Sequence, residues 1–515
     1  MAETTETTIH SPKRRGRSAR REVRTSAELR FLPELDRGIP YLDLMTDEQV
    51  ARIHRATLEL LSDKGIEFRD NESIEIWRKA GADLDGHRVH IGSDLLSHLL
   101  ASAPETYTMA ARNPERSVTL GGRKQLFTPA YGAPNVMDLE GNRRSPGLAD
   151  FHDFVKLAHM SPAMQLSGGV LCEPLDIPVP KRHLHMVYSL IRHSDKPFMG
   201  MVTARDRAED TLAMARILFG EDFVAQNTVM TSIANCNSPL VWDQTMLDAV
   251  KTYSASNQAI LFTPFVLSGA STPASTLGSL VQINAEALAG IAFSQAVRPG
   301  APAVYGQWIG AVSMKSGAPM AGTPEICHLN LMVGQMARHY KLPWRCSGGC
   351  TSAKTLDAQA GYEAARNLYG AVLAGANFIL STTGYMEGAL SQSFTKFVVD
   401  AEQVEMFYRF AAGVDFGELD SALGAMREVE PGGHYLGTQH TLENFERAFM
   451  IPELMHHDSF EQWEADGALD THARAANKVR QLLSDYEAPK LDEAIDEALR
   501  DFIARREREL PDFVT

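Results

Sequence analysis

Three apolar runs in the middle of the chain decide the fold: TVMTSIA (228–234), AILFTPF (259–265) and APAVY (301–305). A longer stretch with helical spacing separates each run from the next. Short apolar runs of this kind are typical of strands that are buried on both faces. A helix between two such strands returns the chain to the same edge of a sheet, so the strands are expected to pair in parallel.

The same alternation continues on both sides and gives eight strand–helix units. The predicted strands are Gln125–Pro129, Gln165–Val170, Pro197–Val202, Thr228–Ala234, Ala259–Phe265, Ala301–Tyr305, Pro343–Cys346 and Asn377–Ser381. The predicted helices lie near 148–160, 180–194, 205–219, 242–255, 276–297, 323–340, 354–375 and 398–412. Eight such units close into a (β/α)₈ barrel. An open doubly wound sheet is the alternative, but no glycine-rich fingerprint opens its first helix.

The fold class is therefore predicted as α/β, a (β/α)₈ TIM barrel with a helical N-terminal segment and a helical C-terminal extension. We expect a disordered basic tail at 1–30, the N-terminal segment at 40–106, the barrel at 107–415, and a flap with the helical extension at 416–515. Helices are predicted near 46–64, 71–79 and 93–103, and a hairpin near 107–120. An apolar stripe in 491–502 indicates a helix that packs on the barrel flank or on a second subunit.

The charge of the chain is unevenly distributed. Its formal net charge is −15, but residues 1–25 hold seven Lys or Arg and three Glu. Such a tail buries too little apolar surface to order itself, so it is interpreted as disordered, with a nucleic-acid or targeting arm as the alternative. The acidic remainder argues against nucleic acid as the main partner.

The cysteines and the hydropathy pattern indicate a protein of the reduced cytoplasm. Five scattered cysteines in a chain of 515 residues do not form a disulfide framework. No uninterrupted apolar run reaches transmembrane length, and no apolar stretch follows the basic residues as a secretory signal requires. We expect no membrane partner and a homo-oligomer.

Functional residues of a barrel enzyme lie in the loops that follow its strands. Four aromatic residues fall in or beside these loops: Tyr131, Tyr305, Trp308 and Tyr385. Ring faces that converge on one mouth suit a quaternary ammonium cation, which has no N–H to donate. The alternative is that each ring packs the barrel rim.

Charged and metal-binding side chains also occur at strand ends. Arg345 ends an apolar strand, so it either clamps a substrate carboxylate or forms a structural ion pair. Glu387 is a candidate acid, base or cation partner, or a solvated rim carboxylate. His434 lies in a glycine-rich segment that forms either a flap over the mouth or a structural loop. Cys346 and Cys350 could bind zinc only with further ligands, for which the candidates are Cys327, His434 and His440. His183 and His185 are interpreted as surface residues.

Four segments together resemble the trimethylamine methyltransferase family. They are Tyr131–Arg144; Ser347–Gly349 with Ala358–Glu363; Ser381–Gly388; and Pro431–Thr441 with Trp463. The resemblance spans about residues 40–500. It implies a (β/α)₈ barrel that transfers a methyl group from a methylated amine to the cobalt of cobalamin, a corrinoid that a small partner protein carries.

Family members that use trimethylamine carry pyrrolysine, whereas this sequence contains only the twenty ordinary residues. It therefore resembles the non-pyrrolysine branch, which acts on betaines such as glycine betaine, proline betaine, carnitine or γ-butyrobetaine. A quaternary ammonium leaves as a neutral tertiary amine, so no residue must protonate it. The enzyme must mainly hold one methyl group in line with its acceptor.

The first hypothesis is a betaine:corrinoid methyltransferase. Tyr305, Trp308 and Tyr385 would surround the cation with Tyr131 nearby, Arg345 and His434 would hold the carboxylate, and Glu387 would complement charge. The second is a trimethylamine or other methylamine methyltransferase, with or without assistance from zinc on Cys346 and Cys350. The third is a non-catalytic betaine-binding barrel whose basic tail contacts nucleic acid.

Overall fold

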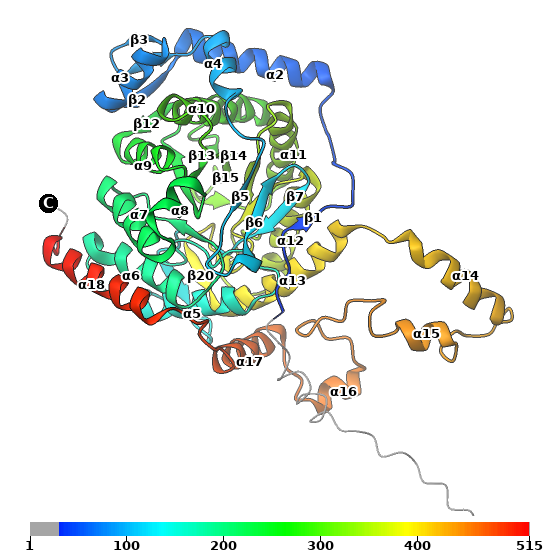
Figure 1. Ribbon diagram of the computed structural model, residues 1–515. Helices are drawn as coiled ribbons and strands as arrows, with labels where there is room; N and C mark the ends of the chain where they lie inside the picture. The colour runs from blue at the N-terminus through cyan, green and yellow to red at the C-terminus, as the bar shows by residue number, and fades with distance from the viewer. Residues whose placement is uncertain (1–29, 514–515) are drawn as a thin grey trace, which may run out of the picture.

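Seven parallel strands form most of the wall of a central barrel in the computed structural model, which describes residues 30–513 (Figure 1). Residues 1–29, almost all of the predicted basic tail, lie outside the described residues. Each strand pairs in parallel with its neighbour. Their order is β10 (Phe198–Gly200), β11 (Met230–Cys236), β13 (Ala259–Ser268), β14 (Ala303–Gly306), β17 (Trp344–Ser347), β18 (Phe378–Leu380) and β7 (Lys124–Phe127).

The run 165–170 closes the ring between β7 and β10. The amide of Gln165 donates to the carbonyl of Phe127 at 3.1 Å, and the amide of Ser167 donates to the carbonyl of Pro197 at 2.9 Å. Gly168 also forms a parallel bridge with Phe198. All eight predicted runs therefore lie in the wall, and the prediction of a closed barrel is confirmed, because an open sheet would leave two edges unpaired.

Helices follow the strands around the outside of the barrel (Figure 1). They are α5 (Leu148–Met160), α6 (Val179–Arg192), α7 (Arg205–Phe219), the short α8 (Glu221–Gln226), α9 (Gln244–Ala255), α10 (Thr276–Val297), α11 (Pro324–His339), α12 (Ala358–Ala374) and α13 (Phe394–Ala412). Caps set their ends. The Asp357 side chain accepts from the amide of Ala360 to start α12, and Gly375 ends it in a left-handed conformation.

An antiparallel hairpin closes the amino-terminal end of the barrel. It consists of β5 (Thr106–Met109) and β6 (Val118–Gly121), with η2 (Pro114–Arg116) in its turn, as the sequence predicts. Tyr107 and Met109 share one buried cluster with Leu261 and Val304 of the wall. The strand β1 (Leu35–Asp36) covers the edge of β7. A ligand must therefore reach the barrel from the end at which its strands finish.

The N-terminal segment is helical, as predicted, but it also contains a small sheet. Its helices are α2 (Asp47–Glu59), the π-helical turn η1 (Leu60–Lys64), α3 (Asn71–Ala80) and α4 (Ser93–Leu100). Its strands β2 (Ile66–Arg69), β3 (Asp83–Asp85) and β4 (Arg88–His90) join β12 (Val241–Asp243) from the barrel. The sequence did not reveal these strands, because three-residue runs such as 83–85 are too short and polar to show an alternating pattern.

Helix α10 is apolar on every side because it is buried on every side. Among the described residues it is the one helix long and apolar enough to cross a membrane, and 78% of that window is buried. It packs on β13 and β14 inside and on α2 and α4 outside. A helix enclosed in this way is expected to be hydrophobic all round, so its composition is that of a core helix.

The C-terminal extension lies on the barrel flank. Helix α17 (Thr471–Ser484) packs on α5 and α13, and α18 (Glu493–Glu509) packs on α6 and α7. Arg506 of α18 donates to Asp210, whose carboxylate also bonds Nε2 of His183 at 2.9 Å. His183 is thus buried, and its interpretation as a surface residue is wrong; it sits where the extension docks. His185 bonds Glu507 of the same helix.

Six short strands build the rim at the carboxyl end of the barrel wall. The sheet β19 (Tyr385–Met386), β20 (Ser391–Ser393), β8 (Asn135–Met137) and β9 (Arg143–Arg144) joins the first and last units. The strand β15 (Trp308–Val312) pairs with the end of β13 and with β16 (Pro319–Met320). Segments that are far apart in the sequence therefore meet at one mouth.

A buried histidine makes the stability of this fold depend on pH. His159 is 4% exposed, and burial, with Lys196 and Arg116 nearby, lowers its pKa from 6.5 to about 2. Below about pH 6.5 the unfolded chain therefore binds a proton that the folded chain does not. The free energy of unfolding then decreases by about 1.4 kcal/mol for each unit by which the pH is lowered. We expect His159→Gln to flatten the slope of unfolding free energy between about pH 6.5 and 5, measured by denaturant titration. An unchanged slope would contradict this.

Candidate active site

Aromatic rings from two separate units meet at the barrel mouth. Trp308 and Tyr385 belong to one buried cluster with Cys350 and with Ala130, Ala133 and Ala321. The Trp308 ring lies flat on Phe265, with 4.1 Å between the ring centroids. Trp308 is 6% exposed and Tyr385 4%, so both rings are shielded from water. The structure thus brings together two of the three rings that the sequence suggested for the cation.

Tyr305 is not part of this cluster, and its assignment to the cation box is wrong. Residues alternate along β14, so Val304 faces the barrel interior and Tyr305 faces the helices. The Tyr305 hydroxyl donates to Oδ1 of Asn284 on α10 at 3.0 Å. Asn284 in turn donates to the hydroxyls of Thr57 and Tyr340. Tyr305 therefore joins the barrel to the surrounding helices.

Tyr131 lies beside the cluster, at the end of the first unit. It is partly buried and packs against the apolar barrel interior. A side chain at Gly169 would come within 2.6 Å of the Tyr131 ring, so a glycine is needed there. Burial raises the pKa of the Tyr131 hydroxyl, and Glu173, Tyr253 and Tyr385 raise it further. Tyr131 therefore stays a neutral, mostly apolar surface.

Arg345 is a buried cation without an acidic partner among residues 30–513. It is 2% exposed, and its guanidinium donates through Nη1 to the backbone carbonyl of Gln307. Its Nε finds no partner. Burial lowers the pKa of Arg345 to about 10. The structural ion pair that the sequence left open does not form within this part of the chain. An unpaired buried charge is costly and is expected to have a ligand of opposite charge.

Other buried polar atoms at the carboxyl end of the barrel also have no hydrogen-bond partner. They belong to residues that the sequence reading missed: Ser347 Oγ, Asn367 Oδ1, Thr383 Oγ1 and Gln392 Oε1. They lie on the last residue of β17, on α12, in the loop after β18 and on β20. Buried polar groups in folded proteins are nearly always bonded, so a concentration of unbonded ones marks a place for a ligand or water. Polar residues at strand ends were the signal available in the sequence.

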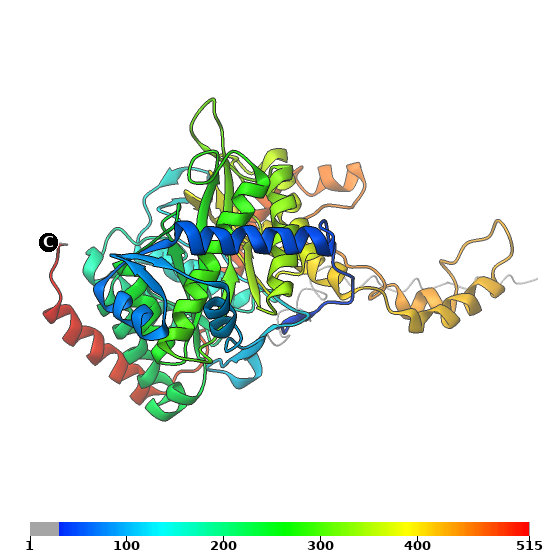
Figure 2. The same cartoon turned by 90° about the horizontal axis from the view of Figure 1, so that it is seen from above.

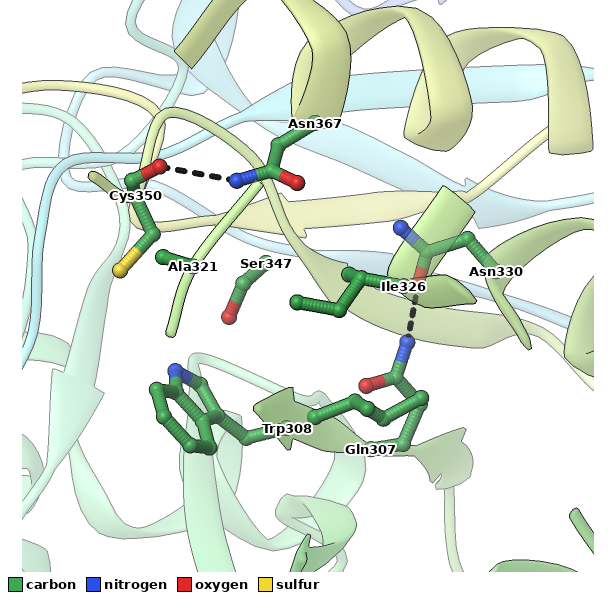
Figure 3. Close-up of a pocket in the computed structure, with 9 residues that line it drawn as sticks. Gln307, Trp308, Ala321, Ile326, Asn330, Ser347, Cys350 and Asn367 are labelled. Carbon is green, nitrogen blue, oxygen red and sulfur yellow. Dashed lines mark hydrogen bonds between the residues drawn. The ribbon is translucent and has the colours of Figure 1, made fainter. Parts of the chain in front are cut away.

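A small pocket opens beside the ring cluster (Figure 3). Trp308, Ser347 and Cys350 face it, and Asn367 closes it by donating to the Cys350 carbonyl at 2.8 Å. Gln307 donates to Asn330 at 2.5 Å along another side. The free volume is about 10 Å³, room for about one water molecule. A ligand the size of a methylated amine would need the surrounding side chains to separate.

A buried ion pair fixes two loops of the mouth, the one after β17 with Gly349 and the one after β18 with Gly384. Lys396 of α13 donates to the carbonyl of Gly349 at 2.9 Å and to the carboxylate of Asp400. Asp400 accepts from the amide of Gly384 at 2.8 Å. These loops carry Cys350 and Tyr385, so the pair sets the position of the ring cluster. The sequence signal is a Lys and an Asp four residues apart in a helix that is otherwise largely apolar.

A second carboxylate, on α12, holds the loop that follows β17. Glu363 of α12 accepts from the hydroxyl of Thr351 and from the amide of Ser352, each at 2.7 Å. Gly322 lies directly against Glu363, because a side chain there would come within 2.6 Å of it. The Ala358–Glu363 motif of the sequence analysis thus holds the loop that follows β17.

Glu387 lies at the rim and is already paired. Its carboxylate is 2.9 Å from Nε of Arg143 and accepts from the Ser391 hydroxyl at 2.5 Å. Its backbone is left-handed, with φ 55°, at the turn after β19. A carboxylate held by a cation and a hydroxyl is a weak candidate for proton transfer, so its contacts favour a role in fixing the rim.

His434 does not lie over the mouth of its own chain. It is exposed on a segment that stands away from the barrel in both views (Figures 1 and 2). The segment begins with η3 (Phe416–Glu418), α14 (Leu419–Glu428) and α15 (Gln439–Asn444) and leads to α16 (Phe460–Ala465). The prediction of a flap over its own barrel is wrong, because the apolar residues of these helices find no partner on that barrel.

The cysteines do not converge on a metal site. Cys346 lies in the core outside the barrel and Cys350 lies in the mouth cluster. Burial raises the pKa of each thiol to about 12. Cys327 donates to a backbone carbonyl, and His440 bonds Ser421 on the distant segment. This arrangement does not support the zinc-assisted alternative.

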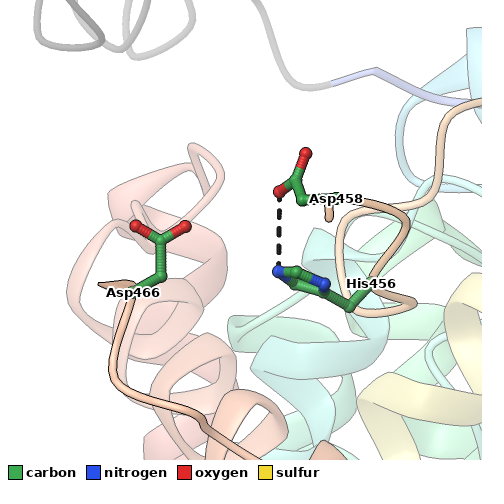
Figure 4. Close-up of side chains that lie close together, drawn as sticks. All are labelled: His456, Asp458 and Asp466. Atoms are coloured by element: carbon green, nitrogen blue, oxygen red, sulfur yellow. Dashed lines mark ion pairs between the residues drawn. The ribbon is translucent and has the colours of Figure 1, made fainter. Parts of the chain in front are cut away.

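Two other groups of possible metal ligands occur among the described residues, and neither is at the mouth. His456, Asp458 and Asp466 lie near the C-terminal helices, with 3.5 Å between His456 and Asp458 (Figure 4). They are exposed or half-buried. Asp70, Glu72 and Asp248 surround the ammonium of Lys251, and Arg205 also pairs with Glu72 and Asp248, so each carboxylate already has a cationic partner.

The buried ion pair yields a test of the loop arrangement. We expect Asp400→Asn to lower the unfolding free energy by about 3–5 kcal/mol, because Lys396 is then a buried charge without compensation. The double variant Lys396→Met/Asp400→Leu should lose less. Denaturant titration measures both. Asp496→Asn is the control, since its partner Arg500 is 63% exposed and such pairs contribute under about 1 kcal/mol. Equal losses for Asp400→Asn and Asp496→Asn would refute the assignment.

The closed barrel carries at its mouth two buried rings, a small pocket and a buried arginine without an acidic partner among residues 30–513. The chain belongs to the trimethylamine methyltransferase family, whose sequence model matches residues 13–511. It is 40% identical over 473 residues to a glycine betaine methyltransferase from Desulfitobacterium hafniense, covering 92% of this chain and 98% of that protein.

Two further comparisons are more distant. The chain is 25% identical over 483 residues to a proline betaine:corrinoid methyltransferase from Eubacterium limosum, covering 91% of this chain and 98% of that protein. The crystal structure of the monomethylamine methyltransferase from Methanosarcina barkeri covers 88% of this chain and 96% of its own, with a TM-score of 0.46 and 11% identity. That likeness is too weak to carry an argument, and the barrel is established by its own strand pairing.

Proposed function

We propose that this protein transfers a methyl group from a small carboxylated quaternary amine, a betaine, to the cobalt(I) of cobalamin carried by a partner protein. The observation that carries the proposal is the buried guanidinium of Arg345, which has no acidic partner among residues 30–513 and lies close to Tyr385. A betaine supplies what this mouth lacks: a carboxylate for the arginine and a cation for the ring faces. The relatives named for glycine betaine and proline betaine support it.

The residues of this chain would bind and orient the substrate and would not transfer protons to it. Trp308 and Tyr385 would face the methylated cation, and Arg345 would hold the carboxylate. The departing amine is neutral and needs no proton, so the reaction does not require Glu387 to leave its ion pair with Arg143. Glu387 would fix the rim together with Arg143. Shielding the site from water would protect the methyl acceptor from side reactions.

The cobalt of the bound corrinoid supplies the nucleophile that accepts the methyl group. The rim suits the approach of a partner protein, because it carries exposed apolar residues. Met314 is 74% exposed, Leu390 46% and Phe265 44%. All three belong to the segments that surround the mouth. We propose that the corrinoid protein docks there, and that both proteins act in the cytoplasm, where the five cysteines stay free.

The defining experiment is a spectroscopic assay of cob(I)alamin methylation with purified protein. We expect methyl transfer from glycine betaine, proline betaine or carnitine, and none from trimethylamine. Transfer from trimethylamine alone would favour the methylamine alternative, and stoichiometric zinc in the active protein would favour its zinc-assisted form. Binding of a betaine without any methyl transfer would favour a non-catalytic barrel.

Arg345 gives a prediction that depends on the substrate. Arg345→Met should lower kcat/KM for the preferred betaine by roughly 10- to 100-fold, since a charge-assisted hydrogen bond contributes about 1.5–3 kcal/mol. Binding of tetramethylammonium, which has no carboxylate, should change less than about threefold. Thermal stability should stay equal or rise, because an unpaired buried charge is removed. Arg500→Met on the exposed face of α18 is the control. If Arg345→Met weakened the betaine and tetramethylammonium by the same factor, Arg345 would not bind the substrate carboxylate.

Trp308 gives a test of the ring faces. The probe is 3,3-dimethylbutyrate, the carbon analogue of glycine betaine, in which a neutral tert-butyl group of the same shape replaces the trimethylammonium and the carboxylate is kept. We expect the wild-type protein to prefer the cation by roughly 2- to 30-fold, from a cation–π contribution of about 0.5–2 kcal/mol. Trp308→Leu should abolish most of that preference and Trp308→Phe should keep part of it, as measured by calorimetry. A preference unaffected by Trp308→Leu would remove Trp308 from the cation site.

A further inference from the structure

A long segment of the chain contacts almost nothing of its own barrel. Residues 413–452, here called the arm, leave the end of α13 and extend away from the body in both views (Figures 1 and 2). Within the arm, α14 packs on α15. Arg409 of α13 holds the far end of the arm to the body by donating to the carbonyls of Arg447 and Ala448.

The arm exposes an unusual number of large apolar side chains. Phe416 is 82% exposed, Phe449 79% and Phe445 54%. The others are Val414, Leu419, Leu423, Met426, Tyr435, Leu436, Leu442 and Ile451. Soluble monomers rarely leave contiguous apolar surface of this kind in water. The arm is therefore expected to be covered by another molecule.

The same chain carries a surface that suits the arm. On the outer face of α12, Tyr362 is 70% exposed and Tyr369 48%, and Phe410 of α13 beside them is 46% exposed. Exposed cations without ion pairs among the described residues lie on α12 or in the loops that precede α11 and α12: Lys315, Lys354 and Arg366. The arm holds seven Asp or Glu and only two Arg. Apolar groups and opposite charges are thus matched between the arm and the face of α12.

We infer that the arm of one copy packs on the outer face of α12 in a second copy. The arm of the second copy packs in the same way on the first. An isologous pair of this kind uses one arm and one face from each chain. A corrinoid partner that binds and leaves at every turnover would use a surface of ordinary polarity, whereas permanent homodimer interfaces are more apolar. The extent of the apolar surface on the arm therefore favours a second copy.

The exchange would complete the mouth. Tyr362 stands in the second turn of α12, directly after the loop 350–357 that borders the ring cluster. An arm that crosses this half of α12 brings its loop 431–436 to the rim of the other copy. His434 and Tyr435 would then face the partner's substrate, which explains why they are far from their own mouth. This second step rests on the proposed function; the pairing itself does not.

The first experiment measures the mass of the full chain in solution by light scattering and sedimentation. We expect twice the chain mass of 56.7 kDa at micromolar concentration. Phe445→Ser/Phe449→Ser in the arm, and separately Tyr362→Ser/Tyr369→Ser on α12, should weaken the pair at least tenfold. Phe223→Ser is the control, since Phe223 is 42% exposed on α8 at another flank. A single-chain mass for the wild type, or variants that pair as tightly as the control, would overturn the inference.

Folding of the variants is checked independently. The substituted arm residues contact little of the body, so circular dichroism and the thermal midpoint of the barrel should match the wild type. Dissociated but folded variants support the pairing. If an arm variant unfolds, the α12 variant provides the same mass test on a helix whose substituted side chains are exposed.

The second experiment asks whose arm serves which mouth. Two differently tagged copies are coexpressed, one with Arg345→Met and one with His434→Ala/Tyr435→Ala, and mixed pairs are isolated through both tags. Betaine binding is measured by calorimetry, so that failure of methyl transfer does not affect the result. We expect both homodimers to bind weakly and the mixed pair to recover about half of the sites. No recovery, or full binding by the arm variant alone, would refute the shared mouth while leaving the mass result standing.

Discussion

The closed ring of main-chain hydrogen bonds is the constraint on which the rest of the structure depends. Every wall strand runs in the same direction, so all loops that follow strands gather at one end. The pairing of β18 with β7 matters most because it brings the last unit next to the first. Without it, the rim sheet that joins β8 to β20 could not form. The hairpin at the opposite end leaves this mouth as the only functional end of the described barrel.

Charge inside the mouth follows from how each buried ion is compensated. Lys396 and Asp400 satisfy each other and hold two glycine loops, and Glu363 is used by backbone and hydroxyl donors. Glu387 is neutralised by Arg143 at the rim. Among these four mouth residues and Arg345, only the arginine has a backbone carbonyl as its sole hydrogen-bond partner. The same physical rule therefore separates the charges that build the site from the charge that is available to a ligand.

Strand parity explains where the sequence interpretation of the site failed. Side chains alternate along a strand, so one residue decides whether a ring faces the mouth or the helices. Tyr305 and Trp308 are three residues apart, on β14 and β15, and they face opposite ways. The unbonded atoms of Ser347, Asn367 and Thr383 come from three different elements, so no local pattern could have grouped them. The arm was predicted to be a flap over the mouth, but it extends away from its own barrel (Figures 1 and 2).

By itself, the sequence determined the eight alternating units, the closed barrel, the helices that surround it and membership in the trimethylamine methyltransferase family. These follow from hydrophobic periodicity, caps and local motifs, which are properties of neighbouring residues. The tertiary structure alone decided that Trp308 and Tyr385 meet, that Tyr305 turns away, that Arg345 lacks a counter-ion and that the arm stands free. Those facts depend on contacts between residues far apart in the chain, and a linear pattern does not encode which of them touch.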